Sequence, residues 1–201
     1  ADIIRKYGGV FISDEVQTGF GRTGKTWGIE HYGVEPDMIT VAKGIANGFP
    51  LAAVISKKEI AGSLEKNSIS TFGGNPVSSA SANATIDIIK RENLSANAKN
   101  MGRRLMNGVK RIQKSYPKTI GDVRGKGLMV GIELVKDETI KDRTPDVEST
   151  NRIMEETKKK GLLIGRGGLY GNSLRIAPAL NIGPNEIDEA LQIINDSFKA
   201  L

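Results

Sequence analysis

The sequence predicts an α/β protein, with a mostly parallel sheet in its first half and a smaller α+β unit in its second half. Up to about residue 92, short apolar runs without polar alternation are separated by helical patterns, as in parallel sheets that are buried on both faces. From residue 93 onwards, longer amphipathic helices flank pairs of short apolar runs. The length of 201 residues allows one or two domains. We therefore expect two domains, residues 1–92 and residues 93–201.

The first half is expected to contain three strands and four helical segments. Gly8 is a plausible helix end, and Asn75 followed by Pro76 is a strong helix start. The expected strands are Val10–Ile12, Met38–Ala42 and Leu51–Ile55. The expected helical segments are Ala1–Gly8, Trp27–His31, Lys57–Glu65 and Pro76–Glu92. This alternation of strands and helices is the order of a parallel α/β sheet.

The second half is expected to combine three helices with short strands. The helix expected at Ala96–Tyr116 carries four apolar residues at helical spacing: Met101, Leu105, Val109 and Ile112. The other expected helices are Val147–Lys160 and Ile187–Phe198. The expected strands are Thr119–Val123, Leu128–Val135, Leu162–Ile164 and Leu174–Ile176, and Lys136–Asp146 is expected to be a charged surface loop. This pattern predicts a small α+β domain.

The composition excludes several kinds of site. The chain has no Cys, which rules out disulfides, iron–sulfur clusters and thiol nucleophiles. The single His, His31, rules out a zinc site built on several imidazoles, so we expect no metal. No apolar run approaches the roughly 18 residues of a membrane-spanning helix, so we expect no membrane partner.

The net charge of +6 has two interpretations. Lys and Arg residues cluster on the helix expected at Ala96–Tyr116, and such a cluster is compatible with a nucleic-acid-binding face. The other interpretation is the solvated face of an amphipathic helix. Aromatic residues make up 5% of the chain, which argues against a stacking platform for single strands. We therefore expect no nucleic-acid partner.

A glycine-rich stretch, Gly19–Gly24, fits the pattern G-x-G-x-x-G. A dinucleotide site needs these glycines directly after a strand and at the start of a helix. Here Glu15–Thr18 separate them from the strand, and no long helical pattern follows. We expect a flexible loop here and no nicotinamide cofactor.

Two residues of opposite charge follow two of the expected strands. Asp14 lies at the carboxyl end of one buried strand, and Lys43 lies just beyond the carboxyl end of the next. Ligands of open α/β sheets bind at this edge, so one flat cofactor could touch both residues. Pyridoxal phosphate uses such a pair, a lysine that forms a Schiff base and an acid on its ring nitrogen. The alternative is that Asp14 and Lys43 form an ordinary ion pair or lie far apart.

A third feature is the run Ser70–Pro76 (STFGGNP), which precedes a helix. Its hydroxyls, its Gly amides and the helix N-terminus suit a phosphate group. The alternative is a tight turn and a well-capped helix without any ligand.

The motifs together resemble the class III pyridoxal-phosphate aminotransferases. The resemblance rests on Ile12–Gly24 (ISDEVQTGFGRTG), Asp37–Gly44 (DMITVAKG), Gly48–Leu51 (GFPL), Thr71–Pro76 (TFGGNP), Asp122–Leu134 (DVRGKGLMVGIEL) and Leu174–Leu180 (LRIAPAL). It spans essentially the whole chain. Within the class, the TFGGNP form of Thr71–Pro76, together with Gly121–Glu133 and Gly161–Gly168, is most similar to the mitochondrial, type 2 branch of the alanine–glyoxylate enzymes.

The resemblance implies a fold and a set of cofactor contacts. Residues 1–92 would be the C-terminal part of a fold-type I large domain, and residues 93–201 the small C-terminal domain. Lys43 would form the Schiff base with pyridoxal 5′-phosphate and shuttle the proton. Asp14 would keep the ring nitrogen protonated, Val16 would pack on the ring, and Gln17 would bind the ring hydroxyl.

The resemblance also implies substrates and a partner. Thr71 would bind the phosphate of the cofactor in a partner subunit, so the active unit would be a homodimer. Arg175 would bind the substrate carboxylate, a task that suits the planar guanidinium. The reaction would be ping-pong transamination, with a donor such as alanine and an acceptor such as glyoxylate or pyruvate. The location would be mitochondrial, or otherwise cytoplasmic.

The chain resembles the C-terminal half of these enzymes. The family places its main phosphate-binding turn and an aromatic that stacks on the ring upstream of the position that matches Ala1. Two other functions therefore stay open: a non-catalytic dimerising fragment, and another reaction of the same cofactor, such as that of an aminomutase or a phospho-lyase.

Overall fold

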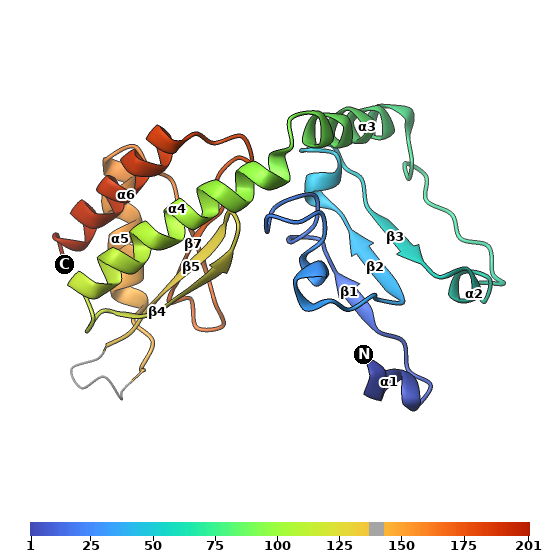
Figure 1. The fold of residues 1–201 in the computed structure, drawn as a ribbon, viewed down its shortest axis with the longest axis horizontal. Helices are drawn as coiled ribbons and strands as arrows, with labels where there is room; N and C mark the ends of the chain where they lie inside the picture. Colours follow the sequence, from blue (N-terminus) through green and yellow to red (C-terminus); the bar gives the residue numbers. More distant parts are fainter. Residues whose placement is uncertain (137–142) are drawn as a thin grey trace. The chain divides into compact units, whose positions relative to one another are not determined.

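The chain forms two units, each with its own β-sheet. The computed structural model describes residues 1–136 and 143–201 and separates them into two units, residues 1–96 and residues 97–201. A three-stranded sheet lies in unit 1 and a four-stranded sheet in unit 2 (Figure 1). Helices and strands occur in both units, which confirms the predicted α/β class. The division into domains at residue 92 stays a prediction, and the middle of the charged loop expected at Lys136–Asp146 lies outside the described residues.

The sheet of unit 1 has the strand order β1-β2-β3. These strands are β1 (Ile12–Asp14), β2 (Met38–Val41) and β3 (Ala53–Ser56). β1 and β2 run parallel, with Asp14 opposite Thr40, as predicted. β3 instead runs antiparallel to β2. The reason is the short connection over residues 42–52, because a parallel crossover needs about a dozen residues or more.

Short helical segments surround this sheet. They are α1 (Asp2–Lys6), the 3₁₀ helices η1 (Gly28–Tyr32) and η2 (Lys43–Ile45), α2 (Lys58–Ala61) and α3 (Pro76–Arg91). α3 starts as predicted, because the Asn75 side chain accepts a hydrogen bond from the Ser78 N–H. α3 contacts η2, and Ser81 Oγ donates to the Ala46 carbonyl at 2.9 Å. This contact holds the segment that follows β2.

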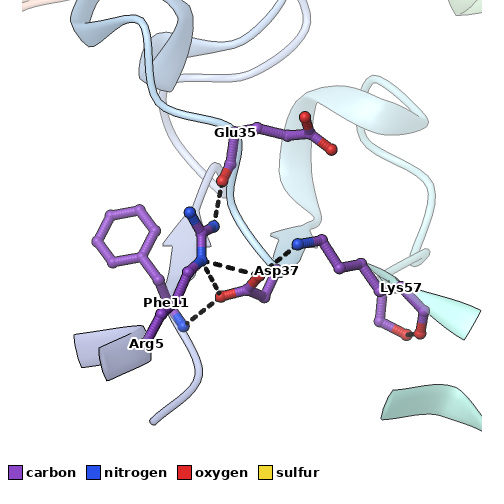
Figure 2. Close-up of polar contacts among 6 residues, drawn as sticks. Arg5, Phe11, Glu35, Asp37 and Lys57 are labelled. Carbon is purple, nitrogen blue, oxygen red and sulfur yellow. Dashed lines mark hydrogen bonds and ion pairs between the residues drawn. The ribbon is translucent and has the colours of Figure 1, made fainter. Parts of the chain in front are cut away.

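A buried carboxylate joins the elements of unit 1 at the amino ends of β1 and β2. Asp37 accepts hydrogen bonds from Lys57 Nζ (2.6 Å), Arg5 Nε (3.1 Å) and the Phe11 N–H (2.9 Å), and Arg5 also donates to the Glu35 carbonyl (Figure 2). The contacts with Lys57 and Arg5 hold the pKa of Asp37 far below its ordinary value. Because this side chain binds the Phe11 N–H, β1 begins two residues later than predicted.

The sheet of unit 2 is antiparallel throughout, in the order β4-β5-β7-β6. Its strands are β4 (Ile120–Lys126), β5 (Met129–Leu134), β6 (Gly165–Gly167) and β7 (Ser173–Ile176). The strand predicted at Leu162–Ile164 is wrong. The Leu162 N–H donates to the Thr157 carbonyl at the end of the preceding helix (2.9 Å), and the ladder starts only at Gly165.

Three helices contribute to the core of unit 2: α4 (Leu94–Ser115), α5 (Val147–Lys159) and α6 (Pro184–Phe198). The core residues are Ala98, Leu105, Val109, Ile112, Ile120, Val123, Leu128, Val130, Ile132, Leu134, Ile153, Leu174, Ile176, Ile187, Ile194 and Phe198. The predicted apolar face of the long helix is confirmed, with Met101 packed at its edge. In the described part of the chain, no helix combines the length and the apolar character needed to span a membrane.

Candidate active site

The candidate site lies at the carboxyl edge of β1 and β2. Asp14 is the last residue of β1, and Lys43 begins η2 one residue after β2 has ended. Because the two strands are parallel neighbours, both residues lie at the same edge of the sheet. Both are exposed. Within the described residues no ion pair joins them, so the structure does not form the ordinary ion pair that was the alternative.

The Asp14 carboxylate is oriented by its neighbours on one side only. Its Oδ1 accepts hydrogen bonds from Thr40 Oγ1 (3.2 Å) and from the Val16 N–H (3.1 Å). Among the described residues, Oδ2 has no donor. A carboxylate that is fixed through one oxygen and open at the other suits a protonated ring nitrogen, so Asp14 fits the acid that pyridoxal phosphate requires.

Lys43 adopts an uncommon backbone conformation. Its φ is 47°, in the left-handed region that costs a residue with a Cβ about 1–2 kcal/mol. The two residues that follow Gly44, Ile45 and Ala46, are buried with Val41 and hold the turn in place. Such strain persists where the surrounding structure imposes it, and it is frequent at functional sites. Lys43 therefore presents its amine from a rigidly held turn.

The glycine-rich stretch forms a loop, as predicted. It is followed by the short helix η1 rather than by a long helix, so it lacks the geometry of a dinucleotide site. Gly21 and Gly24 have φ values of 91° and 89°, which only glycine adopts readily. Trp27 packs locally, with its ring 5.2 Å from that of Phe20, edge to face.

Glu15, to which the sequence motifs assign no role, is a buried neighbour of the site. Only 1% of its surface is exposed. Burial favours the neutral carboxyl, but hydrogen bonds from Thr18, Ile29, Gly28 and Ser13 outweigh this effect and hold the pKa of Glu15 below its ordinary value. The signal that could have revealed it is weak, an acidic residue followed by a loop with many small residues.

The remaining predicted cofactor contacts of unit 1 lie in turns. Val16 is half-buried and Gln17 is exposed, and both belong to the turn that follows β1. Thr71 is exposed in the turn before α3, where the Gly73 N–H donates to the Ser70 carbonyl (3.2 Å). Asp14, Val16 and Gln17 thus lie together at the end of β1, whereas Thr71 lies in a separate turn.

Arg175 belongs to unit 2. It is exposed on β7, where its neighbours in register are Gly131 on β5 and Gly165 on β6. A Cβ at Gly165 would lie 3.6 Å from Arg175 Nε, so the guanidinium packs beside this glycine. Arg175 also lines a cleft of about 400 Å³, together with apolar residues and the carboxylates of Glu186 and Glu189. A guanidinium can bind a carboxylate through two parallel hydrogen bonds.

Comparison with known proteins gives a consistent result. Residues 1–198 match the family model of the class III aminotransferases. The chain is 44% identical over 201 residues to the mitochondrial alanine–glyoxylate aminotransferase 2 homolog 2 of Arabidopsis thaliana, and it covers 42% of that protein.

Solved structures agree. A Bacillus anthracis aminotransferase is 39% identical, with a TM-score of 0.92 over the whole chain, which covers 47% of that structure. A phospholyase from Arthrobacter, in complex with phosphoethanolamine, is 35% identical with a TM-score of 0.93, and the chain covers 48% of it. The chain therefore spans less than half the length of the proteins that it matches.

Proposed function

Because this chain belongs to the class III aminotransferase family, we propose that the complete protein is a pyridoxal-phosphate-dependent aminotransferase. It moves an amino group from an amino acid such as alanine to an oxo-acid such as glyoxylate or pyruvate. The observation that carries this proposal is the carboxyl edge of β1 and β2, where Asp14 has one open oxygen and Lys43 a free amine among the described residues.

In this proposal, each residue of this edge makes a different contact with the cofactor. When bound, pyridoxal phosphate supplies a ring that accepts negative charge from the substrate α-carbon. Lys43 Nζ holds the group covalently and, when released, takes up the proton of the substrate α-carbon. Asp14 Oδ2 accepts a hydrogen bond from the ring nitrogen and keeps its proton in place. Val16 packs on the ring, and Gln17 binds its hydroxyl.

The second set of roles concerns the substrate and the subunits. Arg175 binds the substrate carboxylate through its guanidinium. Thr71 binds the phosphate of the cofactor in a partner subunit, which makes the active unit a homodimer. The support for a mitochondrial location is the similarity to the mitochondrial enzyme of Arabidopsis thaliana.

The test is to trap the lysine in the complete protein. The protein is incubated with pyridoxal phosphate, reduced with borohydride, and mapped by peptide mass spectrometry. We expect a single labelled residue, Lys43, and loss of both label and turnover in Lys43→Ala. The control is Lys58→Ala, which removes an exposed lysine that follows β3 and should keep both. Normal turnover of Lys43→Ala would contradict the proposal.

A phospho-lyase reaction is the second candidate, because the Arthrobacter phospholyase matches the chain as well as the aminotransferase does. The two reactions differ in where the nitrogen goes. Transfer of ¹⁵N from labelled alanine to an added oxo-acid supports the aminotransferase. Release of inorganic phosphate from phosphoethanolamine, without such transfer, supports the phospho-lyase.

A further inference from the structure

Glu15 is a buried charged residue at the carboxyl edge of β1 and β2, and the proposed function assigns it no role. It lies between Asp14 and Val16, which both contact the cofactor ring in that proposal. Its backbone N–H donates to the Thr40 carbonyl at 2.9 Å, so it continues the pairing of β1 with β2. Because side chains alternate along an extended strand, Asp14 is exposed at the sheet edge whereas Glu15 is directed into the following loop, where it is buried.

Four neutral groups surround the Glu15 carboxylate. Oε1 accepts hydrogen bonds from the Ile29 N–H (2.7 Å) and from Ser13 Oγ (3.1 Å). Oε2 accepts hydrogen bonds from the Gly28 N–H (2.8 Å) and from Thr18 Oγ1. An ionised carboxylate only accepts hydrogen bonds, so it can satisfy all four donors without a proton of its own to place. An amide in the same place would turn its own donors towards two of the four groups.

The loop closes tightly around this carboxylate. A Cβ at Gly28 would lie 2.7 Å from Thr18 Cβ and 3.1 Å from Glu15 Oε2. A Cβ at Gly19 would lie 2.9 Å from the Glu15 carbonyl oxygen and 3.0 Å from the Trp27 ring. The Gly19 N–H also donates to the Glu15 carbonyl at 3.0 Å. Gly19 and Gly28 thus let the chain wrap around both the backbone and the side chain of Glu15.

We propose that Glu15 is a positioning residue for the cofactor, because its carboxylate folds residues 15–29 into the loop that orients Asp14 and Val16. This inference rests on the proposed function. The link to the site is short, since Thr18, whose hydroxyl donates to Glu15 Oε2, lies two residues after Val16, whose N–H binds Asp14 Oδ1. Loss of the carboxylate removes its contacts with Thr18, Gly28 and Ile29 and so loosens the turn that carries Val16 and orients Asp14. Glu15 itself stays in the loop and touches neither cofactor nor substrate.

The experiment uses the complete holoenzyme and four variants. Glu15→Gln removes the charge but keeps the shape, and Thr18→Val removes one donor but keeps the volume. Thr18→Ser keeps the hydroxyl and is the matched control for Thr18→Val. Glu30→Gln is the control for the charge, because Glu30 is an exposed carboxylate of η1 that binds the Trp27 N–H and lies just beyond this loop.

The readouts are the dissociation constant of pyridoxal phosphate, the visible circular dichroism of the bound cofactor, kcat and KM. We expect Glu15→Gln to weaken cofactor binding, to reduce the dichroism and to lower kcat by up to about 10²-fold with little change in KM, as for a small misplacement of a reacting group. Thr18→Val should show the same changes to a smaller extent. Thr18→Ser should retain the dichroism, and Glu30→Gln should resemble the wild type throughout.

The outcomes separate this inference from the proposed function. Absence of cofactor on Lys43 in the wild type would overturn both. Wild-type dichroism and cofactor affinity in Glu15→Gln would overturn the inference alone, even with a lower melting temperature, because Glu15 would then be merely structural. If Glu15→Gln does not fold, Thr18→Val decides: a reduced dichroism supports the inference, and an unchanged one overturns it.

Discussion

Different kinds of interaction stabilise unit 1 and unit 2 internally. Unit 2 buries a continuous apolar core between its sheet and its helices. The buried apolar cluster of unit 1 is small, and its members are Val41, Ile45, Ala46 and Ala82. Most of the exposed large apolar side chains also belong to unit 1, among them Ile69 and Phe72. Besides its small cluster, unit 1 has two buried carboxylates, Glu15 and Asp37, each surrounded by hydrogen-bond donors from other segments. In the described part of unit 2, the buried carboxylate of Asp146 instead accepts its hydrogen bonds locally, from Ser149 at the start of α5.

The difference shows that a core can be stabilised by apolar burial, whereas a site needs directional interactions that fix the orientation of its residues. Burial of apolar surface stabilises a fold but is not directional, whereas a hydrogen bond weakens steeply when its angle changes. The residues proposed to hold the cofactor ring belong to unit 1, where Glu15 and Asp37 fix the direction of β1 at its two ends. Unit 2 contributes one proposed site residue, Arg175, on a strand supported by a large core.

The largest expected effect concerns the core of unit 2. Ile132 is fully buried on β5, which pairs with both β4 and β7. Ile132→Ala should cost about 2–5 kcal/mol of the free energy of unfolding, because it leaves a cavity. Hydrogen exchange in the complete protein should show lower protection in β4, β5 and β7 and unchanged protection in β1 and β2.

Val54→Ala is the control for this substitution. Val54 is 60% exposed on β3, so its truncation should change the free energy of unfolding by no more than about 0.5 kcal/mol. An equal loss of protection in both units after Ile132→Ala would contradict the view that the two units depend on separate interactions.

A smaller effect is expected where two backbones of unit 2 meet. A Cβ at Gly102 on α4 would lie 2.1 Å from the Gly127 carbonyl oxygen. Because this neighbour is backbone, Gly102→Ala should cost about 1–3 kcal/mol by overpacking. Gly167→Ala is the matched control, since a Cβ there meets no atom within 4 Å. Thermal unfolding should separate the two variants, and equal melting temperatures would show that α4 shifts without cost.

Local signals explain what the sequence predicted correctly. The pair Asn75-Pro76 marks the start of α3 because the cap and the ring act within a few residues. Asp14 and Lys43 were placed at one edge of the sheet because each follows an apolar run that forms a strand. The apolar face of α4 follows from helical spacing alone.

Contacts between distant residues explain what the sequence did not predict. Two donors to Glu15 are the backbone N–H groups of Gly28 and Ile29, 13 and 14 residues away. Because nearly every residue has a backbone N–H group, the amino-acid types do not reveal which of these groups binds Glu15. The direction of β3 depends on the length of its connection and not on its own residues. The predicted strand at Leu162–Ile164 failed because the Leu162 N–H stays with the end of α5.

Acid should weaken unit 1 more than unit 2. The pKa values of Asp37 and Glu15 are lowered in the folded state, so their stabilisation is complete above the ordinary carboxyl pKa of about 4 and is lost as the pH falls below it. In unit 2 the lowered pKa values of Glu156 and Asp188 belong to ion pairs at the surface, in which Asp188 is half exposed and Glu156 binds the exposed Lys159. Such surface pairs contribute little.

The measurement for this prediction is hydrogen exchange at pH 7 and at about pH 3.5, expressed as protection factors that correct for the intrinsic rate. Protection in β1 and β2 should fall more than protection in β5 and β7. Asp37→Asn should lower the protection of β1 and β2 already at pH 7 and reduce its further loss in acid. Equal losses in both units would show that these carboxylates do not set the acid stability of unit 1.

The smallest effect is expected from an ion pair of unit 2 whose carboxylate, unlike that of Asp37, is half exposed. Arg104 binds Asp188 with both side chains about half exposed, at 47% and 50%, whereas Lys57 binds Asp37, whose side chain is 9% exposed. Arg104→Gln and Lys57→Gln each remove one cation from one carboxylate. The exposed pair is screened by water and salt, so Arg104→Gln should leave the exchange of α4 and α6 unchanged, whereas Lys57→Gln should speed exchange in β1–β3. Equal effects of the two variants would show that burial of the carboxylate does not determine how much such an ion pair stabilises its unit.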